Sequence, residues 1–133
     1  MSEENVETLR AISSAFNQGD IDGLVRYLHP EVEIHPATGG ILDMATMYRG
    51  HDGMRQFAET AWESFDMAVE IEEITTTPEG RILATERWQM RARDGIETGF
   101  QLTDIYTFRD GLIIRIDGFR ERAEALEAAG LSE

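Results

Sequence analysis

The spacing of hydrophobic residues predicts three helices in the first half of the chain. The first helix has apolar residues at three- and four-residue intervals, as one face of an amphipathic helix does: Val6, Leu9, Ile12 and Phe16. Gly19 ends it. Asp20 can cap a second helix that runs to His29, because the residue before Pro30 avoids helical geometry. Asp52 caps a third helix, whose apolar face consists of Met54, Phe57, Ala61 and Phe65.

From Met67 onwards the hydrophobic period changes to two, which predicts strands. Expected strands cover residues 32–35, 67–77, 82–92, 97–108 and 112–120. Asp94-Gly95 and Asp110-Gly111 are hairpin signals. Glu72-Glu73 interrupts the alternation and predicts a β-bulge. A short helix, 122–129, is expected to follow the last strand.

These elements predict a single α+β domain over residues 1–133, in the order helix, helix, strand, helix, four strands and a helical tail. Strands of ten or more residues exceed the usual length, and long strands twist and curl. We therefore expect a curved antiparallel sheet wrapped around helices on its concave side. Such a cone-shaped fold has a mouth, which is the shape of a ligand pocket.

Composition narrows the classes of function. Of the 133 residues, 41% are hydrophobic, which is enough for a core, and none is cysteine, which excludes disulfides and thiolate chemistry. A net charge of −14 disfavours nucleic acid as a partner. No apolar run approaches the ~20 residues of a membrane span, and Met1-Ser2-Glu3-Glu4 does not resemble a signal peptide. We expect a cytoplasmic protein with no membrane partner.

Neither a metal nor a cofactor is expected. The three histidines, His29, His35 and His51, do not have the spacing of a metal motif. The chain also lacks a phosphate-binding loop and a dinucleotide fingerprint. Any reaction would therefore have to use the side chains of the protein itself.

Four segments carry a family resemblance: Ala15-Phe16-Asn17-Gln18-Gly19-Asp20-Ile21-Asp22-Gly23-Leu24, Val32-Glu33-Ile34-His35-Pro36, Tyr48-Arg49-Gly50-His51-Asp52-Gly53 and Phe108-Arg109-Asp110-Gly111-Leu112-Ile113. They resemble the SnoaL-like group of the nuclear transport factor two-like superfamily, whose enzyme model is ketosteroid isomerase. The tail 122–131 is similar to the ending of uncharacterised bacterial members. The resemblance implies the cone-shaped fold. It does not specify the chemistry, because this fold hosts isomerases, cyclases, epoxide hydrolases, dehydratases and plain binding proteins.

The resemblance to ketosteroid isomerase implies two catalytic residues. The base of that enzyme precedes a proline on the first strand, and with a one-residue gap His35 takes this place. Its protonated oxyanion-hole aspartate lies four residues before a phenylalanine, which matches Asp104 before Phe108. Its oxyanion-hole tyrosine aligns with Ile12, which argues against steroid isomerisation itself. Epoxide hydrolases of this fold need an Arg-x-Asp pair on one strand. We expect none on these strands, which disfavours that chemistry.

Strand parity predicts the wall of the pocket. Residues that share the face of Asp104, together with aromatic residues of the helices, are expected to bind the ligand. They are Phe16, Phe57, Trp62, Glu86, Trp88, Leu102, Tyr106, Ile116, Gly118 and Arg120. Burial should raise the pKa of Asp104, which could then donate a hydrogen bond to a substrate oxygen. Alternatively, Asp104 is structural. Glu86 is either a second functional acid or the ion-pair partner of Arg120.

Two main functions remain open. One is a cofactor-free isomerase or cyclase that acts by proton transfer on a small apolar carbonyl or enol compound. His35 would be its base and Asp104 its acid. The other is a protein that binds or shields a small apolar ligand without turnover. A pure dimerisation module is a third possibility.

A homodimer is also expected. With the helices on the concave side, Ile105, Ile113 and Phe119 would lie on an open convex sheet face. An apolar patch of this kind can be buried against its own copy about a two-fold axis.

Overall fold

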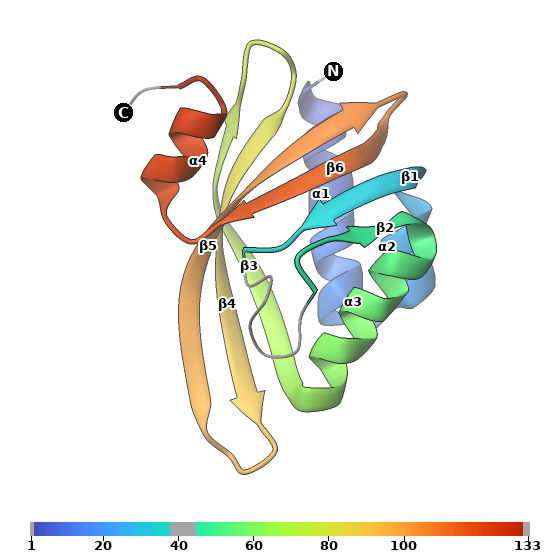
Figure 1. Ribbon diagram of the computed structural model, residues 1–133, viewed down its shortest axis with the longest axis vertical. Coiled ribbons are helices and arrows are strands. Elements are labelled where there is room, and N and C mark those ends of the chain that lie inside the picture. The colour runs from blue at the N-terminus through green and yellow to red at the C-terminus, as the bar shows by residue number, and fades with distance from the viewer. Residues whose placement is uncertain (1, 38–44, 132–133) are drawn as a thin grey trace.

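A curved six-stranded sheet surrounds three helices, and the computed structural model describes residues 2–37 and 45–131 of the chain (Figure 1). The helices are α1 (Ser2–Asn17), α2 (Ile21–Arg26), α3 (Gly50–Ser64) and α4 (Arg122–Ala128). The strands are β1 (Leu28–His35), β2 (Tyr48–Arg49), β3 (Phe65–Thr76), β4 (Ile82–Ala92), β5 (Glu97–Arg109) and β6 (Leu112–Phe119). The α+β architecture and the order of the main elements are confirmed.

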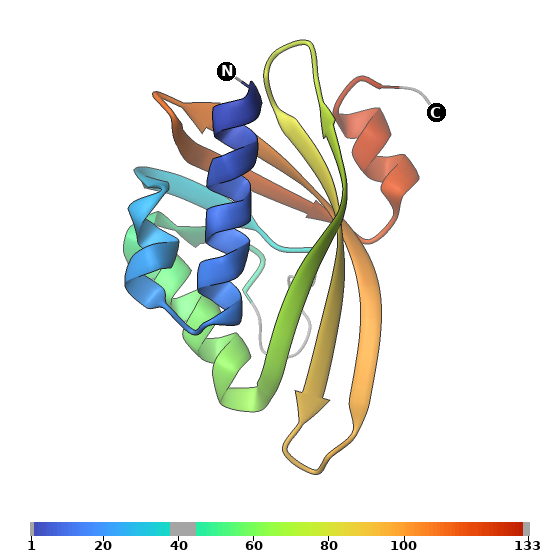
Figure 2. The same cartoon turned by 180° about the vertical axis from the view of Figure 1, so that it is seen from behind.

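The sheet has the order β2-β1-β6-β5-β4-β3 and is not closed. Neighbouring strands are antiparallel except β1 and β6, which are parallel. The sheet is therefore mixed, whereas the sequence predicted an antiparallel one. Helices α1, α2 and α3 lie on its concave side, and α4 lies on the opposite side (Figures 1 and 2). The main core fills the space between the first three helices and the concave face.

The predicted bulge and the tightest hairpin are confirmed. The pairing of β3 with β4 shifts register between Ile71 and Glu73, where the alternation of the sequence breaks. Between β5 and β6, Asp110 has φ 53° and Gly111 has φ 79°. Two consecutive residues of positive φ are typical of a two-residue hairpin turn, and Asp-Gly is among the sequences that best tolerate it.

The second helix is shorter than predicted, and the first strand is longer. Helix α2 ends at Arg26, and Leu28 is already the first residue of β1, opposite Ile113 of β6. Pro30 lies within β1, where the pairing with β6 is interrupted between Leu28 and Glu33. Proline cannot donate a hydrogen bond to the ladder, and it is tolerated there because the pairing is interrupted at that point. The two-residue strand β2 is too short to produce a periodic pattern.

The expected apolar patch on the convex face is absent, because its residues are buried within the chain. Helix α4 covers Ile105, which is 2% exposed and packs with Leu83 and Leu126. Ile113 is completely buried in the main core, because an irregular register between β5 and β6 turns it inward. Phe119 is half-buried against the α4 cluster. Homodimerisation stays a prediction, without this patch to support it.

In the described residues, none of the helices is both long and apolar enough to cross a membrane.

Candidate functional site

A cavity of about 340 Å³ lies between the concave face of the sheet and helices α1 and α3. Pockets for drug-sized ligands commonly measure about 300–1,000 Å³. Apolar side chains make up most of its wall. Nine of the residues predicted from the sequence line it: Phe16, Phe57, Glu86, Trp88, Leu102, Asp104, Tyr106, Ile116 and Arg120. Strand parity therefore places most of the pocket wall correctly.

Two predicted ligand-binding residues lie behind the wall. Trp62 packs against Phe16, with ring centroids 5.4 Å apart, and does not line the cavity. Gly118 also lies outside the lining. A β-carbon on Gly118 would lie 2.5 Å from the backbone nitrogen of Ala37 and 2.8 Å from Oδ1 of Asp104. The missing side chain therefore makes room for the carboxyl group of Asp104 and for the backbone after β1.

Replacing Gly118 by alanine is expected to destabilise the protein by about 1–3 kcal/mol, because the new methyl group must displace backbone or the Asp104 carboxyl. Urea denaturation measures this loss. Gly99→Ala is a matched control, since a β-carbon there meets only one atom, at an ordinary 3.5 Å. Equal stability of the two variants would contradict the proposed close packing around Asp104.

Three polar side chains form the inner end of this apolar cavity. The hydroxyl of Tyr106 donates a short hydrogen bond to Oε2 of Glu86 and lies 3.4 Å from Oδ2 of Asp104. The indole Nε1 of Trp88 donates to Oε1 of Glu86 over 3.1 Å. Strands β4 and β5 position this cluster, because Asp104 pairs with Ala84 and Glu86 lies two residues further along the same face. Glu86, Tyr106 and Asp104 are 2%, 6% and 9% exposed.

Burial strongly affects the ionisation of this cluster. It raises the pKa of Asp104 well above its usual value, and the neighbouring Glu86 adds to the shift by its charge and a hydrogen bond. Burial also raises the pKa of Glu86, while hydrogen bonds from Tyr106, Asp104 and Trp88 oppose that rise. Two adjacent buried carboxyl groups do not both ionise. The raised pKa values favour a proton on the pair, and the hydrogen bonds that Tyr106 and Trp88 donate to Glu86 favour Asp104 as the residue that carries it.

Glu86 does not pair with Arg120, which corrects one of the two alternatives for this residue. Its described partners are Tyr106, Trp88 and Asp104. Arg120 instead donates from Nε to the carbonyl oxygen of Ala37 over 3.2 Å. Hydrogen bonds from the uncharged Tyr106 and Trp88 therefore take the place of the predicted arginine.

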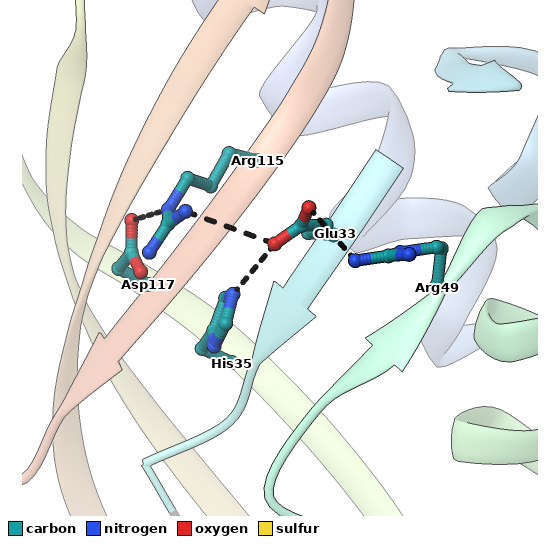
Figure 3. Close-up of polar contacts among 5 residues, drawn as sticks. All are labelled: Glu33, His35, Arg49, Arg115 and Asp117. Carbon is teal, nitrogen blue, oxygen red and sulfur yellow. Dashed lines mark hydrogen bonds and ion pairs between the residues drawn. The ribbon is translucent and has the colours of Figure 1, made fainter. Parts of the chain in front are cut away.

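His35 lies on the outer face of the sheet, away from the cavity (Figure 3). Its Nε2 is 3.1 Å from Oε1 of Glu33, whose other oxygen contacts Arg49 over 3.3 Å. Ile34 and Pro36, on either side of it in sequence, line the cavity instead. Neighbouring residues in a strand point to opposite faces of the sheet. The one-residue gap in the comparison with ketosteroid isomerase therefore selected a residue of the outer face instead of one that faces the cavity. The structure does not bring His35 and Asp104 together.

An Arg-x-Asp pair does occur on β6, contrary to the expectation from the sequence. Nε of Arg115 donates to Oδ2 of Asp117 over 2.8 Å, and both side chains lie beside Glu33 and His35 (Figure 3). Neither residue lines the cavity. This pair therefore gives no support to epoxide hydrolysis in the pocket.

Sequence reasoning treated Tyr106 as part of an apolar wall and missed its hydroxyl contacts. The signal was present, because Glu86, Asp104 and Tyr106 all have the inward parity of β4 and β5. Ser13, Thr60 and Gln101 also line the cavity and were not predicted. Residues 2–37 and 45–131 contain no group of three or more histidine, aspartate or glutamate side chains placed to hold a metal.

Solved structures with the same fold include two that contain small molecules. TerC co-crystallised with polyporic acid is 22% identical, with 96% of this chain and 98% of that one covered and a TM-score of 0.79. A putative polyketide cyclase from Xanthomonas campestris pv. campestris is 18% identical, with coverage of 96% and 97% and a TM-score of 0.78.

A Mycobacterium tuberculosis protein in complex with estradiol-17β-hemisuccinate is 14% identical to this chain. The alignment covers 90% of this chain and 95% of that one, with a TM-score of 0.77. These identities are low, so the three likenesses establish a shared fold alone.

A comparison with curated proteins found no match. The family model of the SnoaL-like domain, in contrast, matches residues 9–116, which include most of the helices and strands described above. This match agrees with the resemblance found in the sequence and with the fold of the similar structures. The chain belongs to the SnoaL-like domain family.

Proposed function

We propose that this protein binds a small, mainly apolar carbonyl compound and catalyses proton transfer on it without a cofactor. The observation that carries the proposal is the pair of buried carboxyl groups, Asp104 and Glu86, at the polar end of an apolar cavity. The pair holds one acid and one base side by side. TerC co-crystallised with polyporic acid and the Mycobacterium tuberculosis protein in complex with estradiol-17β-hemisuccinate support small-molecule binding by a protein of this fold.

The division of roles follows from the ionisation of the pair. Asp104, in its protonated form, donates a hydrogen bond to the carbonyl oxygen of the ligand. The ionised carboxylate of Glu86 takes a proton from the carbon next to the carbonyl, while Asp104 gives its own proton to the oxygen. The ketone thereby becomes its enol, and the reverse transfers regenerate both groups. His35 has no part in this step, because it lies on the outer face.

Deuterium exchange into 1-tetralone tests the proposal without knowledge of the natural substrate. This bicyclic ketone has acidic protons next to its carbonyl. The protein should accelerate the exchange of these protons for deuterium in D₂O above the rate in buffer alone. Positioned acid–base groups typically contribute about 10²–10⁴-fold. NMR measures the exchange, and quenching of tryptophan fluorescence, with Trp88 in the cavity wall, measures binding. Tetralin, which lacks the carbonyl, should bind more weakly.

A specific observation also favours the alternative, a ligand-binding protein without turnover. Glu86 is only 2% exposed and is already hydrogen-bonded by Tyr106 and Trp88, as a structural acid would be. In that case 1-tetralone binds better than tetralin, but exchange stays at the buffer rate. If neither compound binds, both functions are wrong for ligands of this kind.

A further inference from the structure

The inner end of the cavity is buried, and its opening is exposed to solvent. Glu86, Tyr106 and Asp104 are nearly completely buried. Arg120 also lines the cavity but is exposed, and it therefore marks a side where the cavity meets solvent. The side chain of Gln101 is exposed on the other face of β5, where it donates to Glu72. Leu102 lies between Asp104 and Gln101 in sequence and lines the cavity as well. A ligand that fills this space has one end at the carboxyl pair and the other near Arg120.

Arg120 carries the positive charge of this opening. Among the described residues, the lining contains two carboxyl groups, Glu86 and Asp104, and one basic residue, Arg120. The described contact of Arg120 uses Nε alone, which donates to the carbonyl oxygen of Ala37. Within residues 2–37 and 45–131, none of the ion pairs involves this guanidinium. Its two terminal nitrogens therefore remain available, with a geometry that suits a carboxylate.

Several other arginines of this chain are paired with carboxylates. The exposed Arg49 and Arg122 and the half-buried Arg87 each contact a glutamate. Arg120 has no carboxylate partner among the described residues, and neither do Arg10, Arg26, Arg93 and Arg109, but those four lie outside the cavity lining. The bond of Arg120 to Ala37 holds the guanidinium at the opening.

The backbone spacing between Asp104 and Arg120 indicates the length of a ligand that contacts both. Gly118 is the register partner of Asp104, and Arg120 follows it two residues later. Two residues of extended chain span about 7 Å. A single six-membered ring separates a carbonyl group and a carboxylate on its opposite ends by a similar length. A ligand with its two polar groups on opposite sides of one ring matches this backbone spacing, and the flexible side chain of Arg120 adjusts to its length.

We propose that the cavity selects ring compounds that carry a carbonyl oxygen at one end and a carboxylate at the other, with Arg120 as the residue that binds the carboxylate. This inference rests on the proposed function, since it takes the carbonyl end to lie at Asp104. It adds a substrate class, cyclic keto acids, and a residue that determines specificity. Arg120 binds and positions the ligand and takes no part in proton transfer.

The test compares two probes that differ in charge alone. 6-Carboxy-1-tetralone carries the carboxylate opposite its ketone, and the corresponding carboxamide has a similar shape without the charge. We expect the unmodified protein to bind the carboxylate about five- to tenfold more tightly, an effect limited by the solvent exposure of Arg120. Arg120→Gln should remove this preference, and Arg120→Lys should keep part of it, since lysine keeps the charge but loses the forked geometry.

Arg109→Gln is the matched control, because it removes the same charge from an exposed residue outside the cavity lining. Its preference for the carboxylate should equal that of the unmodified protein. The inference is overturned if the unmodified protein binds both probes equally, if Arg120→Gln keeps the preference, or if Arg109→Gln loses it to the same extent. Failure of the proposed function looks different: the carboxamide probe would then bind no better than the matching compound without a ketone, whatever residue occupies position 120.

Discussion

Replacing Asp104 by alanine is expected to lower the protein-dependent exchange of 1-tetralone by about a hundredfold to ten-thousandfold, the range that a positioned acid or base contributes. Alanine removes both the proton and the hydrogen bond that stabilise the developing enol oxygen. Glu86 would remain as a base, but without an acid beside it. NMR detection of deuterium incorporation, at protein concentrations that saturate the ketone, measures the effect.

Two further variants separate chemistry from folding. Asp104→Asn keeps a hydrogen-bond donor but has no transferable proton, so it should retain ketone binding while its exchange rate falls. Asp66→Ala removes an exposed aspartate of β3 that lies outside the cavity lining, and should leave the exchange rate unchanged. Full exchange activity in a folded Asp104→Ala protein would show that another group acts as the acid.

The stability of the fold is expected to fall relative to that of Asp104→Asn as the pH rises. The pKa of Asp104 is raised in the folded protein, so the folded state holds a proton that the unfolded state releases above about pH 4. When folding raises the pKa of a group, the group stabilises the fold fully at pH values below its pKa in the unfolded state. This stabilisation is lost as the pH rises through its pKa in the folded state. Each proton of difference corresponds to a slope of about 1.4 kcal/mol per pH unit.

Urea denaturation of both proteins between pH 4.5 and pH 8 measures this slope. The comparison with Asp104→Asn is needed because other carboxyl groups act in the opposite direction. A hydrogen bond from His35, for example, lowers the pKa of Glu33, so that its contribution is lost as the pH falls. A constant difference in unfolding free energy between the two proteins across this range would contradict a protonated Asp104.

Local sequence patterns alone were enough to predict the architecture. Apolar residues at helical spacing identify α1 and α3, and Asp110-Gly111 identifies the turn between β5 and β6, because these signals depend on neighbours within a few residues. The break at Glu72-Glu73 located a bulge for the same reason. Since strand parity is also local, the inward face of β4 and β5, and with it most of the cavity wall, could be predicted from the sequence.

Contacts between distant segments were decided by the tertiary structure alone. A one-residue offset in β1 turned His35 outward, and a register irregularity beside Ile113 turned that residue inward. Tyr106, and not Arg120, became the partner of Glu86 because β4 and β5 pair in one particular register. Helix α4 covers Ile105, although nothing in its sequence says which face of the sheet it packs on. Parity tells which residues share a face; only the folded chain determines which face meets which partner.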